Sequence, residues 1–141
     1  MTEAGRVLGL DLGDVRIGVA ISDADRRLAL PLGTVHTGAP SDLKAIEALV
    51  REHEVTMVVV GHPRLLSGQV GTRARHAEAF AEALRGFLGI PVVLHDERLT
   101  TVEADRALRD AGASGRERRR VVDRSAAAIL LQAYLDGLPR A

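Results

Sequence analysis

Three carboxylates, those of Asp11, Glu97 and Asp123, occupy positions where an acidic side chain is unusual or points to a ligand. Asp11 lies between Leu10 and Leu12, and a carboxylate in an apolar strand is costly unless it is paired, hydrogen-bonded or metal-bound. Glu97 directly follows a predicted strand, at the end where open α/β sheets bind ligands. Asp123 is predicted on a helix, and the residues that share its face are apolar: Ala126, Ala127, Leu130 and Tyr134.

Each carboxylate also has a purely structural explanation. Asp11 could cap the turn at Gly13, and Glu97 could support the start of the next helix. Asp123 could form a salt bridge with an arginine one turn earlier on its helix. These explanations are independent of one another, however. They do not account for three carboxylates on three elements that one fold would bring side by side.

A cluster of three carboxylates has a definite chemical consequence. The negative charges repel one another and raise the pKa values of the carboxyls unless a cation neutralises them. Hard oxygen ligands favour Mg²⁺ or Mn²⁺, and two such ions can activate a water and stabilise the leaving oxygen of a phosphodiester. The sequence therefore predicts a two-metal site made by Asp11, Glu97 and Asp123, with Asp96 as a neighbour that orients a ligand.

Five apolar runs predict the strands that would carry this site. They cover residues 6–12, 16–22, 28–35, 55–60 and 90–94. Short connections join the first three, with a turn at Asp14-Val15 after Gly13, and this spacing is typical of an antiparallel meander. Pro31 and Gly33 interrupt the third run, which favours an edge or bulged strand.

The helices follow from the 3.6-residue period of the apolar residues. One helix is predicted to start at Ser41 or Asp42 as its N-cap, after the third strand. The others are predicted over 72–88, from 100 or 101 to about 112, and from 117 or 118 to 135, with a loop at 64–71 and a linker at 113–115. The resulting order, βββ-α-β-α-β-α-α, predicts one α/β domain over residues 1–141, a mixed five-stranded sheet flanked by helices in the ribonuclease H-like arrangement.

The composition excludes several other classes of protein. Cysteine is absent, which excludes disulfides, zinc–thiolate sites and cysteine catalysis. Aromatic residues make up only 2%, which disfavours a single-strand binder that stacks bases on aromatic rings. No apolar run approaches the ~20 residues of a membrane span, and a short polar start with no signal peptide makes a bacterial-type cytoplasm the expected location.

The basic residues are almost all arginines, since Lys44 is the only lysine. The formal net charge is +0, so no overall field attracts nucleic acid, but five arginines gather near the last helix. They are Arg116, Arg118, Arg119, Arg120 and Arg124. A solvated helix face or a genome-wide preference for arginine would explain them, and so would contacts with phosphates, which arginine binds through two parallel hydrogen bonds.

Four segments together resemble one known family, the YqgF/RuvX-type proteins, called "putative pre-16S rRNA nucleases" or "putative Holliday junction resolvases". The segments are GLDLGDVRIGVAISD at 9–23, VVVGHP at 58–63, DERLTT at 96–101 and DRSAAAILLQAYL at 123–135. They stand in the family's order and cover nearly the whole chain. The resemblance implies a ribonuclease H-like fold and a metal-dependent nuclease, with Asp11, Glu97 and Asp123 at the family's acidic positions.

The same resemblance implies contacts with nucleic acid. Arg16 and Arg98 fall inside its motifs, as contacts to phosphate or as residues that orient a carboxylate. The chain departs from the family at residues 64–68, where RLLSG replaces a segment that often reads Leu-Asn-Met-Asp/Asn-Gly, so we expect Arg64 to supply a phosphate contact there. His62 stands where an aliphatic residue is common, and we expect a structural role for it. The full predicted set of nucleic-acid contacts is Arg16, Arg64, Arg98, Arg118, Arg119, Arg120 and Arg124.

Four readings of the function stay open at this point. The family resemblance favours processing of the 5′ end of pre-16S rRNA in ribosome biogenesis. Cleavage of branched DNA by a Holliday junction resolvase would use the same chemistry in a symmetric homodimer. A non-catalytic RNA-binding assembly factor would bind no metal through the carboxylates. An actin-like or sugar-kinase ATPase is disfavoured, because it needs two such domains around its nucleotide.

Overall fold

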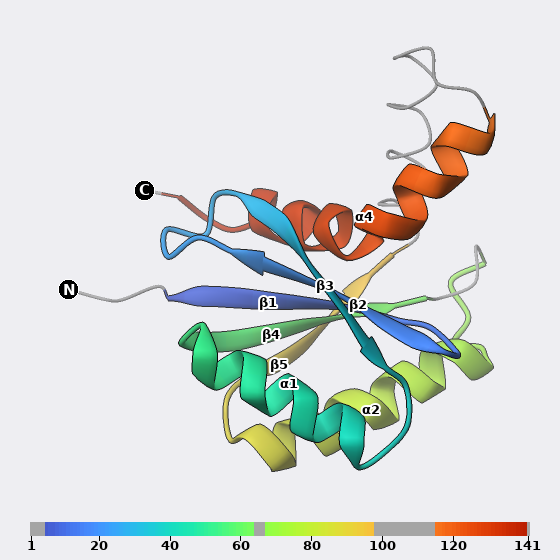
Figure 1. Cartoon of the computed structure of the whole chain (residues 1–141). Coiled ribbons are helices and arrows are strands. Elements are labelled where there is room, and N and C mark those ends of the chain that lie inside the picture. Colours follow the sequence, from blue (N-terminus) through green and yellow to red (C-terminus); the bar gives the residue numbers. More distant parts are fainter. Residues whose placement is uncertain (1–4, 64–66, 98–114, 141) are drawn as a thin grey trace.

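Five strands form one mixed sheet in the order β3-β2-β1-β4-β5. The computed structural model describes residues 5–63, 67–97 and 115–140, with side chains of the last segment from residue 126 onward (Figure 1). The strands are β1 (Arg6–Leu12), β2 (Arg16–Ser22), β3 (Ala29–His36), β4 (Val55–His62) and β5 (Val92–Asp96). The predicted mixed five-stranded sheet is therefore confirmed.

Strand β1 is the middle of the sheet and the place where the strand direction changes. It pairs antiparallel with β2 and parallel with β4, and β4 pairs parallel with β5. The meander of the first three strands is confirmed, including the bulge: Val19 opposes Gly33 and Ala20 opposes Pro31, which leaves Leu32 as the extra residue. Because β1, β4 and β5 are parallel, their carboxyl ends lie at one edge of the sheet.

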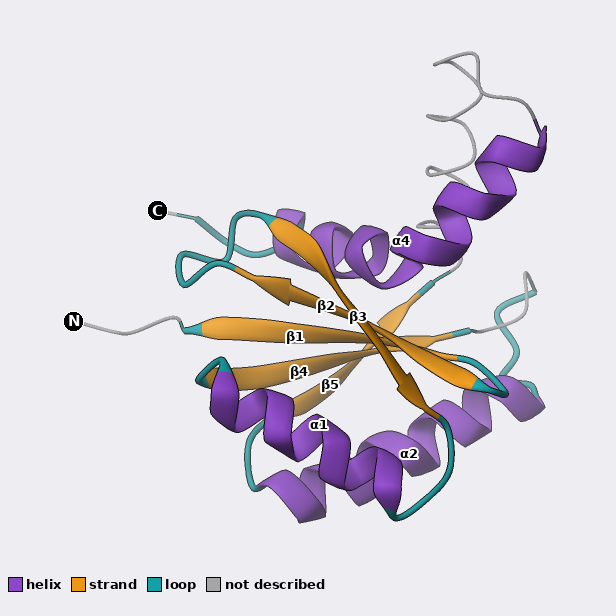
Figure 2. Ribbon diagram, in the orientation of Figure 1, coloured by secondary structure: helices purple, strands orange, loops and turns teal. Residues whose placement is uncertain are grey.

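Helices cover the two faces of the sheet unequally (Figure 2). The helices α1 (Ser41–Glu52) and α2 (Thr72–Leu88) lie on one face, and α4 (Gly115–Asp136) lies on the other. The larger core, under α1 and α2, is built around Leu8, Leu10, Ile46, Val58, Val60 and Leu84. The smaller core, under α4, contains Val7, Ala20, Val59, Ala127, Leu131 and Leu135. The alternation of side chains along each strand thus divides the residues between two cores.

Helix α4 packs against β1 at a glycine. A Cβ atom added to Gly9 would lie 2.8 Å from the Cβ of Leu131 and 3.4 Å from the carbonyl oxygen of Ala127. Real Cβ atoms do not approach so closely, so only glycine at this position lets the helix lie at its observed distance from the strand. The absence of one side chain on β1 therefore fixes how deeply α4 sits.

Several boundaries differ from the predicted ones. Strand β4 runs on through His62, and β5 covers Val92–Asp96 rather than 90–94. Gly61 pairs with His95 and His62 with Asp96, so parallel pairing draws polar residues into β5 that its apolar pattern does not indicate. Backbone hydrogen bonds thus override the hydrophobic boundary at this edge.

The helix starts also needed correction. Pro40, and not Ser41 or Asp42, is the N-cap of α1; Asp42 lies in the first turn, where its carboxylate accepts the N–H of Gly38. Helix α4 begins at Gly115, inside the predicted linker. Helix α2 has the predicted bounds. The predicted helix from 100 or 101 to 112, and residues 64–66 of the predicted loop, lie outside the described residues. No helix in the described ranges is long and apolar enough to cross a membrane.

Candidate metal centre

Asp11 points to the face of the sheet that α4 covers. Val7 and Asp11 are four positions apart on β1, so their side chains share a face, and Val7 belongs to the core under α4. Gly18 of β2 lies opposite Asp11 in the register of the two strands. The carboxylate therefore stands near the carboxyl end of β1, beside a strand position that has no side chain.

Glu97 reaches Asp11 across an intervening strand. It follows β5, and β4 lies between β5 and β1, so the two outer backbones are about 10 Å apart. The Glu97 side chain lies directly over Gly61 of β4: a Cβ atom there would be 2.6 Å from Oε2 and 2.7 Å from Cδ of Glu97. Because Gly61 leaves this space open, the protonated Glu97 carboxyl can donate a hydrogen bond to Asp11.

The pair carries more negative charge than its surroundings neutralise. Burial, followed by the charge of Asp11, raises the pKa of Glu97 to about 7, and the hydrogen bond to Asp11 and the charge of Asp96 act in the same direction. The guanidinium of Arg73 lowers this pKa without restoring its ordinary value. A carboxyl held half-protonated near neutral pH beside a second carboxylate is a site that a cation would stabilise.

The backbone of α4 brings Asp123 toward the same face. Position 123 precedes Ala127 by one helical turn, and Ala127 lines a cavity together with Asp11. A Cβ atom on Gly18 would lie 3.6 Å from the Cβ of Ala127, so helix and strand are in contact beside the acid pair. The side chain of Asp123 is outside the described residues, and within those residues no group of three or more metal-ligating side chains occurs.

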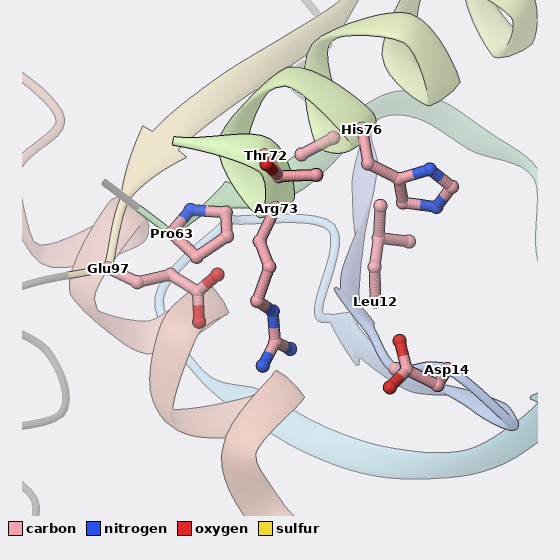
Figure 3. Close-up of a pocket in the computed structure, with 9 residues that line it drawn as sticks. Leu12, Asp14, Pro63, Thr72, Arg73, His76 and Glu97 are labelled. Carbon is pink, nitrogen blue, oxygen red and sulfur yellow. The ribbon is translucent and has the colours of Figure 1, made fainter. Parts of the chain in front are cut away.

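Two cavities flank the acid pair, and each contains an arginine. The larger, of about 440 Å³, is lined by Asp11 and Arg16 beside β2 and β3. The smaller, of about 230 Å³, is lined by Glu97 and by Arg73 of α2 (Figure 3). The two carboxylates thus stand between two openings, each with a positive side chain.

The structure describes some of the other predicted residues and not others. Asp96 lies at the end of β5, and its charge acts on Glu97. The Nε2 atom of His62 lies 2.8 Å from Oε2 of Glu78, which links the end of β4 to α2. Arg64 and Arg98 lie outside the described residues. Four further arginines have a described backbone in α4 but no described side chain: Arg118, Arg119, Arg120 and Arg124.

Two residues of the site, Arg73 and Gly61, were missed in the sequence analysis. Arg73 is the second residue of a correctly predicted helix that starts near the carboxyl end of β4, a place where sheet edges form sites. Gly61 is the glycine that ends an unbroken run of valines, and glycine within a strand often marks a close approach. Both signals were present, but neither says which side chain would occupy the space.

The donor set of the acid pair suits a hard divalent cation. Asp11 and Glu97 offer carboxylate oxygens and no softer ligand, which matches Mg²⁺ or Mn²⁺. Gly61 lies beside Glu97 and Gly18 beside Asp11, so neither of these strand positions places a side chain of its own next to the carboxylates. The residues present therefore fit the predicted metal.

The fold is similar to that of a solved bacterial protein, RuvC. The chain superposes on Thermus thermophilus RuvC, whose structure was solved in complex with a Holliday junction substrate, with a TM-score of 0.52 and 16% identity over 93% of each chain. At this identity the likeness concerns the fold alone, and it confirms the predicted ribonuclease H-like arrangement.

Sequence comparison gives the family. A family model described as RuvX, Holliday junction resolvase, matches residues 5–137. A protein of Anaeromyxobacter sp. (strain Fw109-5), named "Putative pre-16S rRNA nuclease", is 51% identical over 133 residues, which cover 94% of this chain and 97% of the relative. A protein of Nocardia farcinica with the same name is 49% identical over 141 residues, 94% of this chain and 78% of the relative. With a match along almost its whole length, the chain belongs to the RuvX family.

Proposed function

We propose that this protein is a metal-dependent nuclease that hydrolyses phosphodiester bonds in the 5′ region of pre-16S rRNA. The observation that carries the proposal is the contact of Asp11 with Glu97 across Gly61, where burial and then the charge of Asp11 raise the pKa of Glu97 to about 7. Two acids are held together against their repulsion at the ligand-binding edge of a parallel sheet. Their burial has no structural benefit that apolar residues would not provide better.

The residues of the chain divide the work of such a reaction. Asp11, Glu97 and Asp123 would hold Mg²⁺ or Mn²⁺, which when bound supplies an activated water and stabilises the leaving oxygen. Arg16 lines the cavity beside Asp11 and would bind a phosphate of the substrate. Asp96 adds negative charge next to Glu97 and so favours cation binding. Arg64, Arg98 and the arginines of α4 would hold more distant phosphates.

The choice of RNA rests on the names of the relatives. Several relatives, 40–51% identical, are named as pre-16S rRNA nucleases, whereas the family description names a Holliday junction resolvase. Junction cleavage is thus the second candidate, and it would require a symmetric dimer that cuts two strands. A substrate that is precursor rRNA would place the protein in the bacterial cytoplasm, with nucleic acid as its partner.

The decisive experiment compares two substrates and two carboxylate variants. A labelled pre-16S rRNA fragment and a four-way DNA junction are incubated with the protein in Mg²⁺, Mn²⁺ or EDTA. We expect RNA cleavage that needs the metal and that falls at least about 100-fold in Asp11→Asn, as expected when a ligand of a catalytic metal is lost. Asp25→Asn is the matched control, because Asp25 is an exposed aspartate in the β2–β3 turn.

Three results would contradict the proposal. Undiminished cleavage by Asp11→Asn would remove the acid pair from the active site. Cleavage of the junction and not of the RNA would favour the resolvase. Failure to cleave either substrate, together with no metal binding by calorimetry, would favour the non-catalytic assembly factor.

A further inference from the structure

The smaller cavity beside Glu97 is a place where a ligand could meet a positive charge. Nine residues line it, from the end of β1 and the turn after it, the ends of β4 and β5, and the first turns of α2. Arg73 is the only arginine or lysine among those nine, and its side chain is exposed. Figure 3 shows Arg73 extending from α2 between the carboxylates of Glu97 and Asp14. Its guanidinium is therefore available from the cavity rather than enclosed by protein.

Arg73 can bind a ligand while its guanidinium also pairs with a carboxylate. The charge of Arg73 acts on Glu97, which lines the same cavity. Two carboxylates line the cavity together with Arg73, those of Glu97 and Asp14, and either could pair with its charge. A guanidinium, however, presents five N–H donors in a planar fork, so contact with a carboxylate on one edge leaves donors free on the other.

The surroundings of Arg73 favour an anion as the next ligand. Arg73 lies in the first turn of α2, whose N-cap is Gly71 and whose first turn holds no acidic residue. The positive end of the helix dipole therefore adds to the charge of Arg73. Thr72 and His76, which also line the cavity, offer further polar groups. Asp14 opposes this attraction, but its side chain lies in the exposed turn at the mouth of the cavity.

The positions of the two cavities favour a phosphate of the substrate as this anion. Arg16 and Arg73 lie in separate cavities, one reached from Asp11 and the other from Glu97. A polyanion that crosses the acid pair would meet one arginine before the carboxylates and the other after them. We propose that Arg73 binds a backbone phosphate of the substrate strand, on the opposite side of the acid pair from the phosphate held by Arg16. This inference rests on the proposed nuclease function and adds a binding residue to it.

Arg73→Ala tests the inference through binding rather than cleavage. The probe is a fluorescein-labelled, single-stranded RNA oligonucleotide, and affinity is measured by fluorescence anisotropy in EDTA across a series of salt concentrations. We expect Arg73→Ala to weaken binding about tenfold, the value of one charge-assisted hydrogen-bonded contact. We also expect the slope of log K against log salt to fall by about 0.7, the contribution of one phosphate contact on a single strand.

Two further variants separate a phosphate contact from a structural role. Arg75→Ala removes an exposed arginine of the same helix that does not line the cavity, and it should change neither affinity nor slope. Arg73→Lys keeps the charge and loses the fork, so it should restore the salt slope while recovering only part of the affinity. Because lysine also keeps the long aliphatic stem, this variant remains informative if the alanine variant folds poorly.

The outcomes distinguish this inference from the proposed function. Arg73→Ala with the affinity and salt slope of Arg75→Ala overturns the inference, as does a wild-type protein that does not bind the RNA in any salt. Cleavage that survives Asp11→Asn would overturn the proposed function while leaving the Arg73 binding result to stand. For Arg73→Ala, a lowered affinity with an unchanged salt slope would also overturn the inference about Arg73, because that combination indicates a change of shape and no lost phosphate contact.

Discussion

The acid pair shows how a single missing side chain creates a site. Aspartate at position 11 and glutamate at position 97 differ by one methylene, and the longer residue is the one that must cross β4. Gly61 supplies the open path, since any Cβ there would lie within 3.1 Å of three atoms of Glu97. The length of the Glu97 side chain and the absence of a side chain at Gly61 are therefore both needed for the contact with Asp11.

The raised pKa of Glu97 predicts a pH dependence of stability in the metal-free protein. Glu97 titrates near 7 when folded and near 4.5 when unfolded, so between these values the folded state binds more protons. Stability then falls as the pH rises from about 4.5 to about 7. Glu97→Gln removes this titration, and we expect its unfolding free energy to exceed that of the wild type by about 3 kcal/mol above pH 7, with the two converging below pH 4.5.

Urea unfolding in EDTA at several pH values measures this difference. Glu54→Gln is the control, because Glu54 is an exposed glutamate in the turn between α1 and β4 and should leave the pH profile of the wild type unchanged. Parallel profiles for Glu97→Gln and wild type across this pH window would show that Glu97 is not held protonated by its surroundings.

At the scale of elements, α4 packs against the strands that position the acid pair. Its contact with β1 runs through Gly9 and Leu131, and its contact with β2 runs through Gly18 and Ala127. Tyr134 adds an edge-to-face contact with His95 of β5 at a ring-centroid distance of 5.9 Å. The helix thus touches the strand that carries Asp11 and the strand that leads to Glu97.

Gly9→Ala should separate α4 from the sheet. The added Cβ would lie 2.8 Å from the Cβ of Leu131, an atom too close to its backbone to move without the helix. Overpacking of this kind costs about 1–3 kcal/mol, which we expect as a loss of unfolding free energy in urea titration.

Gly86→Ala is the matched control for that substitution. Gly86 is a helical glycine of α2, and a Cβ there would meet nothing within 4 Å. Alanine should therefore raise stability, by up to about 1 kcal/mol, through its better helix propensity. Equal effects of the two substitutions would show that Gly9 does not set the distance between α4 and β1.

The elements were more predictable from sequence than the contacts between them. Helix 72–88 was correctly bounded because Gly89, in the left-handed conformation at φ 74°, ends a clear apolar period. Strand β5 was misplaced by two residues, since His95 and Asp96 join it through pairing with β4 and not through their own hydrophobicity. Asp11 and Glu97 were predicted as partners from topology, but the path across Gly61 depends on side-chain packing, which no periodicity encodes.

At the scale of the whole molecule, the charges balance in sum but are unevenly distributed along the sequence. The formal net charge is +0, yet residues 116–124 contain five arginines. They belong to the first half of α4, the helix that also carries Asp123. Attraction to a polyanion would therefore be local, directed at one end of one helix rather than at the protein as a whole.

Replacing Arg118, Arg119 and Arg120 with alanine tests this separation of charge. If each contacts a phosphate, the salt slope of single-stranded RNA binding should fall by about 2, and affinity should fall at low salt. Arg51→Ala, an exposed arginine of α1 on the other face of the sheet, should leave both unchanged. Identical salt dependence of the triple variant and wild type would show that the cluster is only a solvated helix face.

The order of strands in the sheet has a consequence for biosynthesis. Strands β1, β2 and β3 are joined by short connections and can pair as soon as residues 6–36 have left the ribosome, whereas Glu97 comes from a strand that must dock on β4 afterwards. Asp11 and Glu97 therefore meet only at a late step of folding. A growing chain carries half of its acid pair, so the proposed metal site cannot form until β5 has docked on β4.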